Sequence, residues 1–200
     1  MAGEVLMSRL IVVDTETTGP DLFRHDILSY AFVPMNDAEV LEGFVKGVGE
    51  LTWSDVARSY FESTYDRWAE EAKTPLDAVS EIEAYLDRIG GGSELIMVGH
   101  NVAFDRYFLQ KLAHDAGKSS IRGLSHRSVD THSLLVALSL MGRIPEAAVN
   151  SSGAFKYFGV EPRADLRHTA RGDALATRDL FKLVLEELRS AHVPPEDASH

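Results

Sequence analysis

The stretch IVVDTETTG, residues 11–19, constrains the fold of this chain more than any other. The apolar run 10–13 predicts a buried strand, and Asp14 and Glu16 follow at its end. Residues i and i+2 of a strand point to the same face, so these two carboxylates lean the same way beside the core. Like charges that are close and partly desolvated repel each other and raise each other's pKa. A stable protein therefore needs a reason to keep them together.

Outward from this strand, the sequence alternates between strand and helix patterns. Strands are expected at 10–13, 27–33, 40–45, 95–98 and around 128–129. Helices are expected at 75–89, 104–116, 131–141 and 173–188. The first three strands are joined by short links, which predicts an antiparallel meander, whereas the last two arrive after helices. We therefore predict an α/β fold with a mixed sheet of about five strands flanked by helices.

Composition limits the class of protein. The chain has 200 residues, of which 44% are hydrophobic and 26% are charged, as expected for one globular domain. It contains no cysteine, which excludes disulfides, thiolate metal ligands and a cysteine nucleophile. The N-terminal stretch does not resemble a signal peptide, and no apolar run approaches the roughly 18 residues of a membrane span. We expect a single domain over 1–200 with its core at about 9–190, frayed ends, no membrane contact and a cytoplasmic location.

The formal net charge of −11 argues against a general, long-range attraction to nucleic acid. It does not exclude a nucleic-acid enzyme, because bound cations can cancel carboxylates and basic residues can cluster. One basic cluster lies within nine positions and consists of Arg163, Arg167, His168 and Arg171. On its own, this cluster is most simply interpreted as a solvated loop.

Two further aspartates lie where helix packing would not favour them. Asp105 borders an apolar helical stripe, and Asp173 begins the stripe of the last helix. A carboxylate beside apolar side chains costs free energy unless it is paired. Either residue could instead cap its helix, since aspartate is favoured at N-caps and the helix dipole favours an anion there. Asp130 also follows an apolar strand, and for it a helix cap is the favoured interpretation.

Strand ends and helix starts in an α/β sheet tend to converge on one crevice. The carboxylates expected to converge there are Asp14, Glu16, Asp105 and Asp173. Two divalent cations, Mg²⁺ or Mn²⁺, would make their repulsion tolerable and would stabilise the attacking and leaving oxygens of a phosphoryl displacement. His168 is a candidate general base, because imidazole titrates near neutral pH. As a lone histidine, it is more simply interpreted as a surface or core residue.

Three stretches resemble the motifs of a known family. VVDTETTG (12–19), GHNVAFD (99–105) and HTARGD (168–173) are similar to the three motifs of the DEDDh exonucleases, the DnaQ-like family of the ribonuclease-H-like superfamily. Those motifs are D-x-E, H-N-x-x-F-D and H-x-x-x-x-D, in this order, and the resemblance covers about residues 9–188. It implies a ribonuclease-H-like fold and two-metal hydrolysis that releases 5′-mononucleotides from 3′ ends.

The resemblance also implies roles for individual residues. The positions that hold metal match Asp14, Glu16, Asp105 and Asp173. The general base matches His168, which distinguishes this branch from one that uses tyrosine. The positions near the terminal residue of the substrate match Thr17, His100, Asn101 and Phe104. Phe104 could stack on a base, and ordinary core packing is an equal alternative.

The chain departs from the family pattern in one region. Many proofreading members carry a stretch resembling H-G-I-T after the third strand, where this chain has WSDVARSYFESTYDRWAEEAKTP (53–75), expected to be irregular or helical. Trp68 in this stretch could stack on a nucleobase, but anchoring a loop to the core is the simpler interpretation. The stretch NSSGAFKYFGVEP (150–162) is expected to hold a mobile flap.

We therefore expect a two-metal-dependent 3′→5′ exonuclease that acts on single-stranded 3′ ends. DNA is favoured over RNA, because D-T-E-T-T-G is closer to the DNA-acting members. A 3′→5′ exoribonuclease that trims RNA or short oligonucleotides is an alternative, since discrimination at the 2′-hydroxyl depends on contacts that sequence does not show. Two other classes are a catalytically silent nucleic-acid-binding or scaffold module and a structural Ca²⁺ or Mg²⁺ protein. No motif identifies a polymerase or repair protein as a partner.

Overall fold

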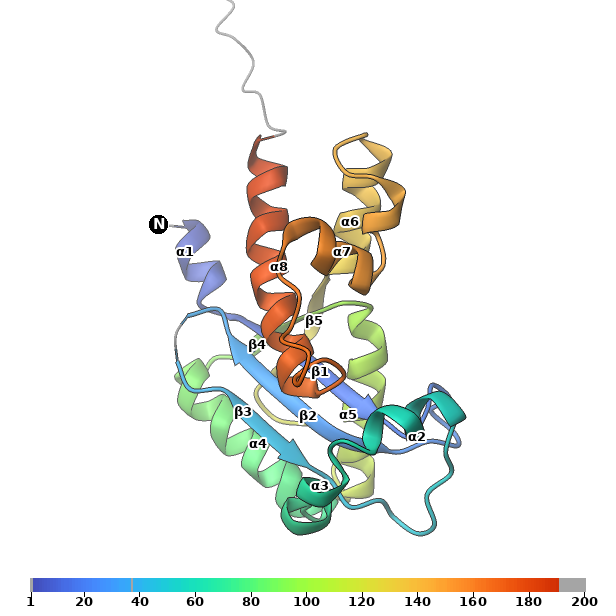
Figure 1. Cartoon of the computed structure of the whole chain (residues 1–200). Helices are drawn as coiled ribbons and strands as arrows, with labels where there is room; N and C mark the ends of the chain where they lie inside the picture. The colour runs from blue at the N-terminus through green and yellow to red at the C-terminus, as the bar shows by residue number, and fades with distance from the viewer. Residues whose placement is uncertain (1, 37, 191–200) are drawn as a thin grey trace, which may run out of the picture.

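A five-stranded mixed sheet organises the chain in the computed structural model, which describes residues 2–36 and 38–190 (Figure 1). The strands lie in the order β3-β2-β1-β4-β5. Their bounds are β1 Leu10–Thr17, β2 Ile27–Pro34, β3 Leu41–Phe44, β4 Leu95–Gly99 and β5 Leu124–Asp130. The central strand β1 pairs antiparallel with β2 and parallel with β4. The predicted α/β class, the antiparallel meander and the five-stranded mixed sheet are thus confirmed.

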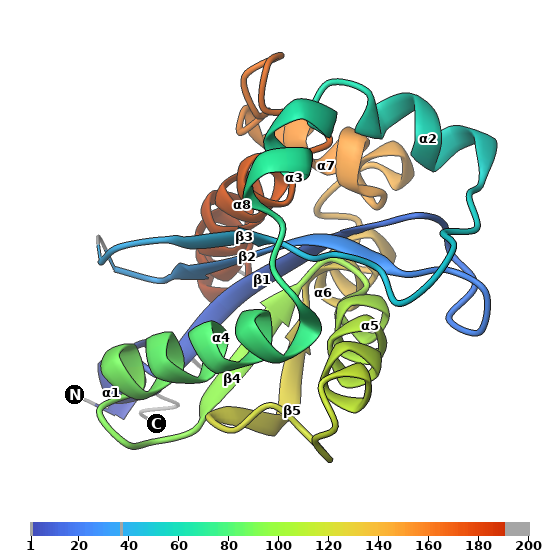
Figure 2. The ribbon, with the colours of Figure 1, turned by 90° about the horizontal axis from the view of Figure 1, so that it is seen from below.

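Helices cover both faces of this sheet. Figure 2 shows α4 and α5 on one side of the strands and α8 on the other. The helical segments are α1 Ala2–Met7, α2 Asp55–Phe61, α3 Tyr65–Glu71, α4 Pro75–Gly90, α5 Val102–Asp115, α6 Thr131–Leu140, the 3₁₀ turn η1 Glu146–Ala148, α7 Ser151–Phe158 and α8 Ala170–Ser190. Every helix within residues 2–36 and 38–190 is too short or too polar to cross a lipid bilayer.

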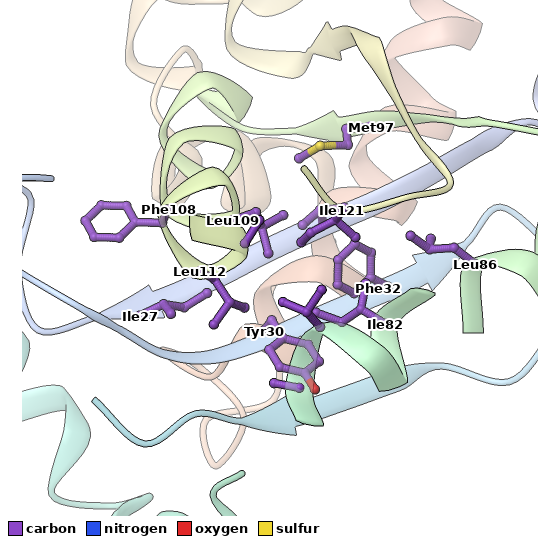
Figure 3. Packing of buried hydrophobic residues seen from close by; sticks show 14 of the residues in the cluster. Ile27, Tyr30, Phe32, Ile82, Leu86, Met97, Phe108, Leu109, Leu112 and Ile121 are labelled. Carbon is purple, nitrogen blue, oxygen red and sulfur yellow. The ribbon is translucent and has the colours of Figure 1, made fainter. Parts of the chain in front are cut away.

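The alternation of β1 assigns its residues to two cores. Ile11 and Val13 belong to the core beneath α4 and α5, whose packing Figure 3 shows around Phe32 and Ile82. Leu10 and Val12 belong to the core beneath α8. Because side chains alternate along a strand, Asp14 and Glu16 continue the α8 face, whereas Thr15 continues the α5 face. This alternation decides which helix each catalytic candidate meets.

The central strand is longer than its apolar run predicts. Pairing with β2 continues through the polar residues, with Asp14 opposite Ala31 and Glu16 opposite Ser29, and it becomes irregular only between Glu16 and Thr17. Both carboxylates therefore lie within β1 and not after its end. The backbone hydrogen bonds of the ladder hold their positions, although the local sequence 14–17 has no apolar pattern of its own.

Local signals account for the bounds of α4, one of the helices that the sequence located to within one residue. The hydroxyl of Thr74 accepts a hydrogen bond from the Asp77 amide at the start of α4, and Pro75 occupies its first position. Gly91 ends the helix in the left-handed conformation at φ 56°. The predicted helix 75–89 is confirmed to within one residue.

Two stretches with uncertain sequence signals are helical. The aromatic-rich stretch forms α2 and α3, and the indole nitrogen of Trp68 donates to the carbonyl of Val45 at 2.7 Å, which confirms the anchoring interpretation. The stretch expected to hold a mobile flap forms the helix α7, and the side chain of its residue Phe155 is buried. Asn150 caps this helix by accepting from the Gly153 amide at 2.9 Å. The C-terminal tail expected to be frayed falls on residues 191–200, outside the described residues.

Candidate active site

Three carboxylates meet where β1 passes beneath the first turn of α8. Oxygen atoms of Asp14, Glu16 and Asp173 all lie within 4.8 Å of one another. The two β1 residues reach this point because they share the α8 face of the strand, and Asp173 faces them from the helix. The sequence-based expectation that strand ends and a helix start would converge is therefore realised for these three residues.

Asp173 does not cap its helix. The hydroxyl of Thr169 takes that role by accepting from the Gly172 amide at 3.1 Å. The carboxylate of Asp173 instead accepts a hydrogen bond from Nη1 of Arg167 through Oδ2, while its buried Oδ1 has no hydrogen-bond partner in the structure. A buried carboxylate oxygen normally has a partner, so this atom fits a site for a cation.

Asp105 approaches the same pocket from the other face of the sheet. It lies in the first turn of α5, and its side chain is 5% exposed. The helix is preceded by Asn101 at its N-cap position, so Asp105 is not the cap. Its Oδ1 accepts a hydrogen bond at 2.8 Å from Thr15, the β1 residue between the two carboxylates of the α8 face. Asp105 is thus beside the three-carboxylate group and not within it.

Burial and mutual repulsion favour the neutral forms of these acids. Desolvation raises the pKa of Asp14 well above its usual value, and the charges of Asp105 and Glu16 raise it further. Burial, followed by repulsion from Asp173, raises the pKa of Glu16 to about 8. Burial raises the pKa of Asp105 to about 7, although the hydrogen bond from Thr15 opposes this shift. Such a cluster is costly to ionise without a bound cation.

The acids line a pocket of about 410 Å³ together with His168, His100, Asn101 and Phe104. His168 lies on the loop before α8 in the left-handed conformation at φ 62°. Its imidazole stacks on the ring of Tyr60 with centroids 3.7 Å apart and planes 7° apart. Burial, and then the charge of Arg167, lower the pKa of His168. A neutral imidazole at the pocket wall is in a state that can accept a proton.

The residues predicted to lie near the end of the substrate are placed differently from one another. Burial lowers the pKa of His100 to about 4, and its Nδ1 lies 3.2 Å from the hydroxyl of Thr131. Phe104 both lines the pocket and packs on Phe108 at 4.8 Å, so the two interpretations of this residue coexist. Thr17 is outside the pocket lining, and its hydroxyl donates to the carbonyl of Gly19 at 2.9 Å.

Asn101 and Asp130 are linked by a structural contact. The backbone amide of Asn101 donates to Oδ1 of Asp130 at 3.0 Å, and the same oxygen accepts from the backbone amide of His132 at 3.0 Å. Asp130 is the N-cap of α6, which confirms the favoured interpretation of this residue. Its hydrogen bond also holds the turn that presents Asn101 and α5 to the pocket.

The basic cluster of the sequence divides into two pairs. Arg163 bonds to Asp165, and both Arg163 and Arg171 are exposed. Arg167 and His168 instead line the pocket. The sequence alone does not separate these two pairs, because all four residues lie on one loop and helix start. It also did not assign Tyr60 to the site, since Tyr60 reaches the pocket from α2 and only tertiary packing places it there.

No protein-family model matches this sequence, and no curated protein sequence matches it either. The fold, however, is similar to solved structures of Escherichia coli exonuclease I. The complex of that enzyme with a dT13 oligonucleotide has a TM-score of 0.72 and 16% sequence identity over 91% of this chain and 42% of the other. A zinc-bound exonuclease I–ssDNA complex has a TM-score of 0.71 and 16% identity, covering 90% of this chain and 41% of the other.

A product-bound structure of exonuclease I is similar to the same degree, with a TM-score of 0.72 and 15% identity over 90% of this chain and 44% of the other. The chain therefore spans about two fifths of the length of these structures. At such low identity the likeness establishes the fold alone. That fold is ribonuclease-H-like, as the motif resemblance implied, and it is shared with an exonuclease.

Proposed function

We propose that this chain is a metal-dependent 3′→5′ exonuclease that removes 5′-mononucleotides from single-stranded DNA ends. One observation carries the proposal, namely the group of three buried or half-buried carboxylates within 4.8 Å whose member Asp173 has an unpaired, buried Oδ1. Such a group is unfavourable in a folded protein unless it binds cations. We further propose that residues 1–200 form one catalytic domain and act in the cytoplasm, which remain predictions from the sequence.

The donor set fits hard divalent cations. Asp14, Glu16 and Asp173 offer only carboxylate oxygens, which suit Mg²⁺ and Mn²⁺, and Asp105 lines the same pocket from the α5 side. Two such ions, when bound, would neutralise charge on the attacking and leaving oxygens of the phosphodiester. The hydrogen bond from Thr15 orients Asp105 for that role.

His168 would accept the proton of the attacking water at an imidazole nitrogen. Its stacking on Tyr60 limits rotation of the ring, which keeps the nitrogen aimed along one plane. The half-buried Phe104 at the pocket wall offers a face on which the terminal base could stack, an interaction that tolerates any sequence. The five residues that match the metal-holding and general-base positions of the family all line one pocket, which favours an enzyme over a silent binding module.

Single-stranded DNA is the preferred substrate in this proposal. The D-T-E-T-T-G form favours it, and the similar solved structures of exonuclease I are described as complexes with a dT13 oligonucleotide and with ssDNA. A gel time course on matched 5′-labelled DNA and RNA oligonucleotides, each with Mg²⁺, Mn²⁺ or EDTA, tests it. We expect metal-dependent shortening from the 3′ end, faster on DNA. Faster shortening of RNA would instead indicate an exoribonuclease, and no cleavage of either would contradict the proposal.

Replacing His168 with alanine separates proton transfer from metal binding. We expect turnover to fall by about 10²–10⁴-fold, the usual contribution of a general base. Mg²⁺ affinity, measured by titration calorimetry without nucleic acid, should stay close to that of the wild type, since the imidazole is not part of the carboxylate group. Loss of Mg²⁺ affinity in His168→Ala would make this residue a ligand and not a base.

A further inference from the structure

Arg167 is held at the edge of the carboxylate group by three contacts. Its Nη1 donates to Oδ2 of Asp173, and its Nη2 donates to the hydroxyl of Ser152 at 3.1 Å. The guanidinium carbon also lies 5.6 Å from the ring centroid of Phe155, a cation–π arrangement. The side chain of Arg167 is only 25% exposed. Two of these partners belong to α7 and one to α8, so the guanidinium bridges the two helices across the pocket.

This arginine is the pocket's permanent positive charge. Within the described part of the chain, the residues lining the pocket include no lysine and no second arginine. A guanidinium is not deprotonated in proteins, so its charge is present at every working pH. It also lowers the pKa of Glu16 and of Asp173, against the effect of burial. In the absence of a divalent cation, Arg167 therefore compensates part of the negative charge of the group.

A divalent cation bound by the three carboxylates would share Asp173 with Arg167. Mg²⁺ binds oxygens at about 2.0–2.1 Å, and a doubly charged ion on Asp173 would repel the guanidinium that now contacts Oδ2. The contacts of Arg167 with Ser152 and Phe155 come from α7 and do not involve the carboxylate of Asp173. They can therefore keep a displaced Arg167 side chain at the pocket wall. The fork of a guanidinium matches two oxygens of a phosphate, which is the group the substrate brings to this place.

We propose that Arg167 is a substrate-phosphate ligand that serves as the counter-ion of Asp173 until metal binds. The inference rests on the proposed function, because it needs both a divalent cation and a nucleic-acid phosphate at this pocket. Metal binding frees the guanidinium for the phosphate, so the two binding events are linked through one side chain, and the linkage is reciprocal. The family motifs do not include this position, which directly precedes His168.

The proposal makes opposite predictions for metal binding and for cleavage. Arg167→Met keeps an apolar stem over Phe155 but removes the competing charge. Titration calorimetry with Mg²⁺ and no nucleic acid should therefore show binding about tenfold tighter than in the wild type. Single-turnover cleavage of a 5′-labelled oligothymidylate at saturating Mg²⁺ should become about 10–100-fold slower, because a charge-assisted phosphate contact is lost.

Arg163→Met is the matched control. Arg163 lies four residues earlier on the same loop, is 78% exposed and pairs with Asp165 outside the pocket. Its replacement should change neither Mg²⁺ affinity nor the cleavage rate. Arg167→Lys keeps the charge without the fork, so its Mg²⁺ affinity should stay within about threefold of the wild type while cleavage slows. This second variant decides the question if thermal melting shows that Arg167→Met does not fold.

The outcomes separate this inference from the proposed function. Equal or weaker Mg²⁺ binding by Arg167→Met would overturn the inference, since a residue that merely positions Asp173 should weaken metal binding when it is lost. An unchanged cleavage rate in both Arg167 variants would overturn the phosphate contact. If the wild type itself neither binds Mg²⁺ nor cleaves the oligonucleotide, the proposed function fails first.

Discussion

At Asp14 and Glu16 the protein keeps two acids in a place that opposes their ionisation. Asp14 lies opposite Ala31 in the ladder and Glu16 opposite Ser29, so neither carboxylate has a cationic partner across the strand pair. Burial raises the pKa of both residues. A residue selected for stability alone would not be acidic here. The cost at these residues supports the proposal that the site binds cations.

This cost predicts how the stability of the metal-free protein depends on pH. Glu16 has a pKa of 4.5 when unfolded and about 8 when folded, so between these values the folded state binds more protons. The contribution of Glu16 to stability is therefore fully present below pH 4.5 and is lost as the pH rises through about 8. Glu16→Gln removes this loss. Thermal melts in EDTA should show that the melting temperature of Glu16→Gln rises relative to that of the wild type as the pH increases from 5 to 8.5.

Glu186→Gln is the matched control for this experiment, because Glu186 is exposed on α8. Its melting temperature should follow that of the wild type across the same range. If Glu16→Gln also follows the wild type at every pH, the folded-state pKa of Glu16 is not raised and the electrostatic description of the site is wrong.

Asp14→Asn should separate function from stability. The substitution keeps the size of the side chain and removes one of the mutually repelling charges. We expect cleavage to be abolished and the melting temperature in EDTA to rise by about 2–4 °C, the shift that corresponds to about 1 kcal/mol in a chain of this length. A fall in melting temperature would show instead that Asp14 contributes to folding.

At the scale of elements, the site depends on segments that meet only through tertiary packing. The alternation of β1 sends Asp14 and Glu16 toward α8, and sends Thr15 toward Asp105 on α5. Sequence reasoning located each of these carboxylates but treated them as one group of four. It did not divide them between two faces of the sheet, because it expected the strand to end at Val13. Pairing with β2 extends the strand, and only that pairing assigns the faces.

α7 (Ser151–Phe158) is a helix that was not predicted from the sequence. Its local signals are present, since Asn150 caps the helix and Gly159 ends it at φ 69°. The intervening sequence SSGAFKYF contains glycine and serine, which favour turns in isolation. Burial of Phe155 against the α6 and α8 side chains makes the helix stable in the folded chain. The local sequence pattern does not reveal tertiary packing of this kind.

α2 contributes to the site through Tyr60, and this contact can be tested. Tyr60→Phe keeps an aromatic face against His168, whereas Tyr60→Leu removes it. We expect Tyr60→Phe to keep the wild-type kcat. We expect the kcat of Tyr60→Leu to be up to about tenfold lower, in line with the 0.5–1.5 kcal/mol of an aromatic pair. Mg²⁺ affinity should be the same in both variants. Equal kcat in both would mean that the stacked arrangement does not position the imidazole.

At the scale of the whole molecule, the sequence was sufficient for the architecture, and it singled out the three acids that the structure brings within 4.8 Å of one another. The mixed sheet of five strands and the order of its links were predicted and are confirmed, and the fold is similar to that of exonuclease I. The geometry of the site was beyond the sequence, since Asp14 and Asp173 are far apart along the chain. Arg167 in particular was visible only as part of a basic cluster, and its contact with Asp173 depends on how the loop before α8 folds.

If Asp14, Glu16 and Asp173 form a metal centre, anomalous diffraction from crystals soaked in Mn²⁺ should locate the ion. We predict anomalous density bounded by these three carboxylates, together with displacement of the Arg167 guanidinium from Asp173. Crystals of Asp173→Asn, soaked in the same way, should show weaker density or none. Absence of density among the three carboxylates in the wild type, in crystals whose protein remains active with Mn²⁺ in solution, would contradict the account.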